Sequence, residues 1–445
     1  MRPRMGHGAS AGGATRPDAD SERPRTRLDT GSGRARLAPA IPPKSPLRRD
    51  HPPRPKRKEP VLLSGRLPEC AHPTLRTQCR RGMPAIRGQT AERGMWTDPR
   101  AEDGSQIIES LPKVELHRHL EGSLRMATLL ELARGNGLPV PRDERALRAQ
   151  VQVLPQDPLT WQNFLSKFEA LRHFFKSPEV ISRLVRESIE DLAADRVLYA
   201  ELRFTPAALA ASRGFSVDEV MDWVLEAGRE AMHAAGVRVA WIASINRHEP
   251  IQMAERVARA AAERRGRGLV GLDLAGNEVD FPTDPFASIF RDAAKSGLGI
   301  SVHAGEWSDG GSVYHAMESL GALRIAHGVR AIEEPRALEM ARERRIAFEV
   351  CLTSNVASGA VRSYAEHPLP RLIQAGVQVT LNSDDPSICG IRLSDEYRAA
   401  MQHFGLSHDS LRGLILAAVQ AAFLPAKDKR RLEGQLQAEL FAKAS

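Results

Sequence analysis

The chain has 445 residues, of which 42% are apolar and 5% aromatic, and it is long enough for one large domain or two ordinary ones. No stretch approaches the roughly 20 uncharged apolar residues of a membrane-spanning helix, so we expect no membrane partner. The net charge of +8 comes from residues 1–94, which hold 21 Lys and Arg against 8 Asp and Glu; residues 95–445 hold 42 against 47, so we expect no nucleic-acid partner for the folded part.

Residues 1–94 are rich in Arg, Pro and Gly, as in RPRTRLDTGSGRAR and PPRPKRKEP. Apolar residues are too few there to bury a face, so we predict a disordered basic extension. Its densest cluster, Lys56–Lys58, could serve as a nucleic-acid or membrane-surface arm. We favour the simpler interpretation of a start codon assigned too far upstream, with Met95 as the alternative start. Residues 95–445 are then the folded domain.

The four cysteines form no C-x-x-C pair and give no disulfide framework. A reducing cytoplasm is the compartment that fits this pattern, so we expect a cytoplasmic protein. The sequence leaves the oligomeric state open. The cysteines are Cys70, Cys79, Cys351 and Cys389.

From Leu111 onward, eight short apolar runs alternate with helical stretches. Val, Ile, Leu and Ala dominate the runs, as expected for strands buried on both faces. Eight strand–helix units over roughly 280 residues predict an α/β fold, a (β/α)₈ TIM-type barrel. A doubly wound open sheet is the alternative, weakened by the lack of G-x-G-x-x-G after the first run. The predicted strands are 113–119, 197–204, 237–245, 269–276, 298–305, 323–328, 346–354 and 377–383.

The intervening segments have apolar residues at helical spacing, for example VISRLVRESIEDLAAD, VDEVMDWVLEAGREAMHAAG and IQMAERVARAAAERR. The first connection, from His119 to Val197, is much longer than the others. We therefore predict extra helices there that cover the barrel mouth and cap a substrate pocket. The C-terminal tail, residues 411–440, predicts one or two closing helices.

Polar side chains gather where several of the runs end. The first run ends in His117-Arg118-His119, and because side chains alternate along a strand, both histidines point into the barrel. A barrel brings the carboxyl ends of its strands to one face, so groups at the ends of later runs converge with them. Those groups are His303 with the following Glu306, His327, and the pair Asp384 and Asp385.

Three histidines and a carboxylate suit Zn²⁺ or another first-row divalent metal with one position open to water. A lone strand histidine is usually a packed core residue, so this prediction depends on the four groups together. The remaining histidines lack such a context, and we interpret them as surface or core residues. They are His173, His233, His248, His315, His367, His403 and His408.

At these residues the sequence resembles the adenosine deaminase family, which belongs to the amidohydrolase-type metal-dependent barrels. The segments PKVELHRHLEG, LDLAGNE, SVHAGE, IAHG, CLTSNV and LNSDDP occur in the order of that family. The resemblance extends from about Leu111 to Leu440. It implies a zinc-dependent hydrolase that replaces the exocyclic amino group of an adenine ring with oxygen, with one Zn²⁺ per chain.

The resemblance also implies roles at matching positions. Glu306 matches the acid that protonates the ring nitrogen next to the attacked carbon, and His327 the residue that orients and deprotonates the attacking water. Attack puts charge on that nitrogen, and a protonated carboxyl removes it, so burial should raise the pKa of Glu306. The zinc ligands are matched by His117, His119, His303 and Asp384. The substrate contacts are matched by Asp385, Gly276, Glu121 and His119, so His119 has both roles.

The substrate depends on Glu121, because the family commonly has Asp there, at a sugar contact. Adenine deaminases often carry H-x-H-L-E-G, whereas AELRFTP and FLSKFEALRHFF resemble nucleoside enzymes. We predict deamination of adenosine and 2′-deoxyadenosine to inosine and deoxyinosine. Adenine and aminodeoxyfutalosine are the alternative substrates, and N6-methyl-AMP is disfavoured because that group has Asn where Glu121 stands.

Two other classes are weaker. A phosphotriesterase-like barrel hydrolase usually carries a carbamylated lysine, and LVGLDLAGNE contains none. An inactive binding protein on this fold should have lost Glu306 or a ligand, and all are present. A cytidine-deaminase-type site needs P-C-x-x-C, which the chain lacks.

Overall fold

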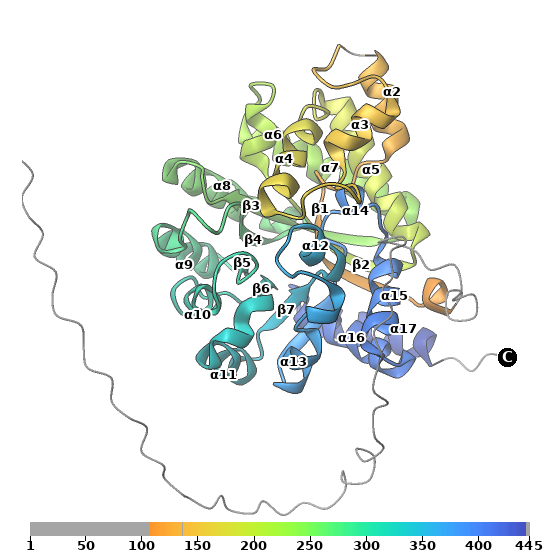
Figure 1. Cartoon of the computed structure of the whole chain (residues 1–445). Helices are drawn as coiled ribbons and strands as arrows, with labels where there is room; N and C mark the ends of the chain where they lie inside the picture. Colours follow the sequence, from red (N-terminus) through yellow and green to blue (C-terminus); the bar gives the residue numbers. More distant parts are fainter. Residues whose placement is uncertain (1–106, 136, 442–445) are drawn as a thin grey trace, which may run out of the picture. The chain divides into compact units, whose positions relative to one another are not determined.

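The computed structural model describes residues 107–135 and 137–441, so the predicted extension, residues 1–94, lies outside the described range. Eight parallel strands follow one another in sequence order around a nearly closed barrel, with helices outside it (Figure 1). This confirms the (β/α)₈ barrel and excludes the open doubly wound sheet. The strands are β1 (Lys113–His119), β2 (Val197–Phe204), β3 (Arg238–Asn246), β4 (Leu269–Ala275), β5 (Gly299–Ala304), β6 (Arg324–His327), β7 (Ala347–Val350) and β8 (Gln378–Leu381).

The seam between β1 and β8 is joined through Asp384, just beyond the end of β8. The backbone N–H of His119 donates to the Asp384 carbonyl at 2.8 Å, and the Asp384 N–H donates to the His117 carbonyl at 2.9 Å. Asp384 also forms an isolated parallel bridge with Arg118. The barrel therefore closes at the residues that the sequence predicted as metal ligands.

The strands are buried on both faces, as their apolar composition predicts; all seven residues of β1 are buried. One predicted boundary is wrong. The run 346–354 was expected to be a single strand, but β7 ends at Val350 and helix α12 (Leu352–Ala357) begins two residues later. The Glu396 carboxylate accepts the N–H groups of Leu352 and Thr353 at 2.6 and 3.0 Å, and these contacts stabilise the helix start.

The three segments predicted as helices are α5 (Pro178–Ala194), α7 (Val217–Ala235) and α8 (Ile251–Glu263). The other connections carry further helices. These are α6 (Pro206–Ala211), α9 (Ala287–Lys295), α10 (Gly310–Ser319), α11 (Pro335–Arg344), α13 (Leu369–Gln374), α14 (Pro386–Cys389) and α15 (Leu393–Phe404), with short 3₁₀ turns η1 (Arg265–Arg267), η2 (Asp284–Phe286), η3 (Val329–Glu333) and η4 (Tyr364–Glu366).

The first connection contains the predicted extra helices, α2 (Met126–Gly135), α3 (Glu144–Val151) and α4 (Trp161–Arg172), ahead of α5. The C-terminal tail forms two helices, α16 (His408–Ala421) and α17 (Ala426–Leu440), which contact each other (Figure 1). Within residues 107–135 and 137–441, no helix is long and apolar enough to cross a membrane.

Candidate active site

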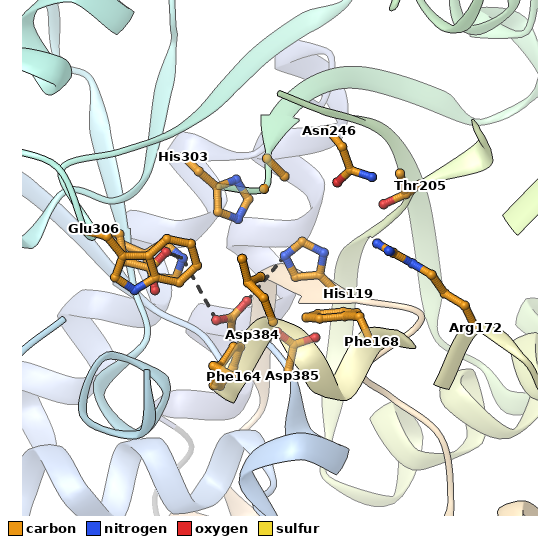
Figure 2. Close-up of a pocket in the computed structure, with 15 residues that line it drawn as sticks. His119, Phe164, Phe168, Arg172, Thr205, Asn246, His303, Glu306, Asp384 and Asp385 are labelled. Atoms are coloured by element: carbon orange, nitrogen blue, oxygen red, sulfur yellow. Dashed lines mark ion pairs between the residues drawn. The ribbon is translucent and has the colours of Figure 1, made fainter. Parts of the chain in front are cut away.

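The barrel brings the four predicted metal ligands together from three strand ends. His117 and His119 end β1, His303 lies in β5, and Asp384 follows β8. One ligand atom of each lies within 4.8 Å of the others, and all four residues are buried. Figure 2 shows His119 and Asp384 facing each other, with His303 beside them.

The atoms in this group suit a cation. His117 Nε2 lies 3.0 Å from Asp384 Oδ1, and His119 Nε2 lies 3.4 Å from the same oxygen. His117 Nε2 and Asp384 Oδ1 are both buried without a hydrogen-bond partner. In a neutral His117 whose Nδ1 carries the proton, these are two facing lone pairs, and a metal ion would satisfy both.

Carboxylates behind the ligands fix the imidazole rings. His117 Nδ1 lies 3.0 Å from Glu349 Oε2, and His303 Nδ1 lies 3.0 Å from Asp273 Oδ1. Arg203 lies between the two acids, 2.7 Å from Glu349 and 3.3 Å from Asp273. When each Nδ1 donates to its carboxylate, Nε2 remains a lone pair directed into the barrel, as metal-binding histidines require.

Two site residues have backbone conformations that only glycine adopts freely. His327 has φ of +64° and Asp384 has φ of +58°. Each such residue costs about 1–3 kcal/mol and persists only where the surrounding structure holds it. Asp384 is held by the seam described above, and its Oδ2 accepts a hydrogen bond from Ser354 Oγ at 2.6 Å.

Glu306 follows β5 in a loop that the Glu278 carboxylate organises. Glu278 accepts the N–H groups of Gly305 and Glu306 at 2.6 and 3.0 Å, and those of the next two residues at 3.1 and 3.3 Å. Glu306 is 3% exposed. Its Oε1 accepts from Ser358 Oγ at 3.2 Å, and its Oε2 lies 3.4 Å from His327 Nε2. Burial raises the pKa of Glu306 well above its ordinary value, and the charges of Asp384 and Glu278 add to this.

A cavity lies over the four predicted metal ligands and Glu306. Seven of the predicted site residues line it, together with apolar side chains from α4. The prediction that the first connection covers the pocket is therefore confirmed. Figure 2 shows the polar groups converging on it. The predicted lining residues are His119, Gly276, His303, Glu306, His327, Asp384 and Asp385; the others are Phe164, Leu165, Phe168, Arg172, Thr205, Asn246, Ala275 and Trp307.

Two predicted residues do not line the cavity. His117 lies behind the other ligands and is fully buried. Glu121, expected at a sugar contact, is 1% exposed; its Oε1 accepts the Thr205 N–H at 2.9 Å, and its Oε2 has no hydrogen-bond partner. Gly276 does line the cavity, with φ of +88°, a conformation that favours glycine.

The residues that support the metal ligands were not predicted from the sequence. Glu349, Asp273 and Arg203 are charged residues inside strands that are mostly apolar, and that contrast could have marked them. His367 was interpreted as a surface or core histidine; it is buried, and its Nε2 lies 3.2 Å from Asn355 Oδ1. Asn355 Nδ2 in turn lies 3.0 Å from His327 Nδ1. No sequence signal marked this contact.

Comparison with known proteins decides the family. A profile described as adenosine deaminase matches residues 112–439. The chain belongs to the adenosine deaminase family. Relatives named adenosine deaminase include those of Vibrio cholerae, 34% identical over 73% of this chain and 97% of the relative, and of Klebsiella pneumoniae, 36% identical over 73% and 98%.

Solved structures from the family have the same fold. An adenine deaminase from Arthrobacter aurescens is similar with a TM-score of 0.69 and 27% identity, over 75% of this chain and all of that one. The Arabidopsis ADAL protein complexed with IMP is similar with a TM-score of 0.67 and 29% identity, over 75% and 98%. One of these neighbours is named for adenine, and the other is bound to IMP.

Membership in the family makes this protein a hydrolase that carries out deamination. The family is metal-dependent, and the buried group of three histidines and Asp384 could hold the metal ion. Among its structural neighbours, the Arabidopsis ADAL protein binds the purine nucleotides IMP and GMP.

Proposed function

We propose that this protein hydrolyses adenosine and 2′-deoxyadenosine to inosine and deoxyinosine, releasing ammonia, with one Zn²⁺ per chain. One observation supports this most strongly. Glu306 and His327 lie 3.4 Å apart beside the four-residue metal group, in the same cavity. A proton donor and a water-binding imidazole are the groups that hydrolysis of a ring amidine needs.

The residues that would hold the zinc are His117, His119, His303 and Asp384, a set that fits Zn²⁺ with one position open. When bound, the ion supplies a Lewis acid that lowers the pKa of water toward neutrality. Glu349 and Asp273 keep the His117 and His303 rings oriented for it.

Glu306 delivers a proton to the ring nitrogen next to the attacked carbon. Negative charge develops on that nitrogen as the water oxygen adds, and the proton removes it. The buried carboxyl holds a proton readily because its pKa is raised. His327 binds the attacking water through Nε2, the ring atom that faces Glu306.

Asp385 and Gly276 line the same cavity and would contact the purine. The Asp385 Oδ1 atom is buried without a hydrogen-bond partner, and burial, with the charges of Asp384 and Glu121, raises the pKa of this carboxyl well above its ordinary value. A protonated Asp385 can donate to a purine nitrogen. The apolar side chains of Phe164 and Phe168 from α4 would cover the sugar side.

A second candidate substrate is an adenine nucleoside that carries an anionic group. Arg172 lines the cavity, and its guanidinium carbon lies 5.5 Å from the Phe168 ring centroid. Its Nε is buried without a hydrogen-bond partner. Figure 2 shows its guanidinium directed into the cavity, where it could bind a phosphate or carboxylate.

The test is ammonia release by the zinc-loaded full chain from adenosine, 2′-deoxyadenosine, adenine, AMP and aminodeoxyfutalosine. Adenosine and 2′-deoxyadenosine should give the highest kcat/KM. Preference for AMP or aminodeoxyfutalosine, lost in Arg172→Gln, would favour the second candidate, and preference for adenine would contradict both nucleoside assignments. The cytoplasmic location and the absence of nucleic-acid or membrane partners stay predictions from the sequence.

A further inference from the structure

A chain of hydrogen bonds reaches His327 from outside the cavity. The backbone N–H of Leu369 donates to His367 Nδ1 at 3.0 Å. His367 Nε2 lies 3.2 Å from Asn355 Oδ1, and Asn355 Nδ2 lies 3.0 Å from His327 Nδ1. Neither His367 nor Asn355 lines the cavity, and both are buried.

The direction of this chain is fixed at its outer end. A backbone N–H only donates, so His367 Nδ1 accepts and carries no proton. Burial lowers the pKa of His367 to about 3, so the ring is neutral and its proton is on Nε2. His367 therefore donates to Asn355, whose oxygen faces it.

The same logic continues to the active site. With its oxygen toward His367, Asn355 presents its NH₂ group to His327 Nδ1 and donates to it. A proton on His327 Nδ1 would place two hydrogen-bond donors, this N–H and the Asn355 N–H, against each other without an acceptor. Rotating the Asn355 amide by 180° would not remove the clash between donors, because its NH₂ group would then face the Nε2–H of His367.

We infer that Asn355 and His367 are positioning residues that hold His327 as the tautomer with its proton on Nε2. This inference rests on the proposed function, and it changes one role in it. His327 then meets the attacking water as a hydrogen-bond donor. It cannot take the water proton at Nε2, which is the role that the family resemblance implied.

The water proton needs another acceptor, and Glu306 Oε2 lies 3.4 Å from the same Nε2. In this scheme the Glu306 O–H bond breaks and an N–H bond forms at the ring nitrogen as the water oxygen bonds to the ring carbon. One O–H bond of the water breaks, and its proton passes to the Glu306 carboxylate that has just lost its own. Glu306 then gives that proton to the amino group as the C–N bond breaks and ammonia leaves, and the hydroxyl proton of the adduct returns to Glu306 as the carbonyl forms. His327 keeps its own proton throughout.

The tautomer is measurable without substrate, so this test is independent of whether the proposed substrate is right. The zinc-loaded full chain would carry ¹⁵N-labelled histidine, and His327 would be assigned by comparison with His327→Gln. Nitrogen chemical shifts should show a protonated Nε2 and an unprotonated Nδ1. A proton on Nδ1, or on both nitrogens at neutral pH, would overturn the inference.

Asn355→Asp replaces the donor to His327 with an acceptor of the same size. It should move the His327 proton to Nδ1 and lower kcat by up to about 10⁴-fold, the loss seen when a catalytic histidine is held in the wrong tautomer. KM and zinc content should stay within a few-fold of the wild type. If His327 acts as the base, this variant keeps or gains turnover, and that result would contradict us.

Two variants at His367 distinguish a hydrogen-bonding role of this side chain from a packing role. His367→Gln can still donate an N–H to Asn355, whereas His367→Leu cannot. The Gln variant should stay within a few-fold of wild-type kcat, while the Leu variant should lose at least about tenfold and show mixed His327 tautomers. Equal losses in both, at equal zinc content, would show a packing role only. If the Leu variant fails to fold, the wild-type nitrogen shifts still decide the question.

Discussion

Glu306 is the side chain on which the chemistry depends most. It is buried, and its two oxygens contact Ser358 and His327, and its backbone is fixed by Glu278. A carboxyl held this way delivers a proton to one defined point in the cavity. Because it is not a member of the metal group, its chemistry and metal binding can be tested separately.

Replacing Glu306 with Gln should therefore stop turnover while the metal stays. We expect kcat to fall by about 10²–10⁴-fold or more, because general acid–base catalysis contributes that much and the amide has no proton to transfer. Steady-state kinetics and metal analysis of the purified variant check this. Loss of zinc together with activity would mean that Glu306 has been assigned the wrong role.

The pH dependence should be asymmetric. Burial lowers the pKa of His327 well below 6.5, so its charge state does not change between pH 6 and neutrality. The raised pKa of Glu306 means that it keeps its proton to higher pH than an ordinary carboxyl, and activity should decline as that proton is lost. We expect kcat/KM to be flat from pH 6 to neutrality and to fall above it. A decline as the pH drops through 6.5 would contradict this assignment.

At the level of single residues, the sequence was informative where a strand ended in a metal-binding side chain. Alternation along β1 places His117 and His119 on one side, and the structure agrees. The alternation of side chains along one strand does not predict which residues of other elements contact the site. Glu121 lies behind Thr205 because its carboxylate binds that backbone N–H. Asn355 of α12 contacts His327, and His367, the residue after η4, contacts Asn355.

Three strands supply the metal group, and three others supply its support. Glu349 on β7 and Asp273 on β4 each contact one histidine ligand, and Arg203 on β2 joins them. This interior network explains why charged residues occur in buried strands. Its ion pairs and hydrogen bonds keep the rings of the two histidine ligands oriented.

Glu349→Gln should weaken metal binding and leave the fold in place. Losing an outer partner of a metal ligand typically costs 10–100-fold in affinity, so we expect a zinc Kd raised by about that factor. Competition with a chelator measures the Kd. Glu366→Gln, an exposed acid in η4, is the control and should bind zinc like the wild type. Unchanged affinity in Glu349→Gln would show that the network is not needed for binding.

Among elements, the strands were predictable because each is a short apolar run bounded by glycine or polar residues. The end of β7 was not, since CLTS continues the apolar run and only Glu396, 44 residues away, stabilises the helix start there. Long-range capping of this kind leaves no local pattern. Hydrophobic periodicity alone likewise did not predict how many extra helices the first connection contains.

For the molecule as a whole, the barrel closes at the seam that carries Asp384, and the first connection covers the resulting site with α4. The family match spans residues 112–439, so everything the proposed reaction needs lies within the barrel domain. The basic residues 1–94 are outside that match.

Deleting residues 1–94 should leave deamination unchanged within about twofold. The reason is that every residue of the proposed mechanism lies between Glu115 and Glu396, in the described barrel. Kinetics of the full and truncated chains on adenosine, at equal zinc occupancy, make the comparison. A large loss of activity in the truncated protein would assign those residues a role in the reaction or in binding.

The central claim is that this barrel is a zinc-dependent deaminase of an adenine nucleoside, and one titration tests it most directly. The full chain, stripped of metal with a chelator, would be titrated with Zn²⁺ while inosine and ammonia formation from adenosine are measured. We predict no turnover in the stripped protein and full recovery at one Zn²⁺ per chain. Equal turnover without metal, or none from adenosine at full occupancy, would contradict the account.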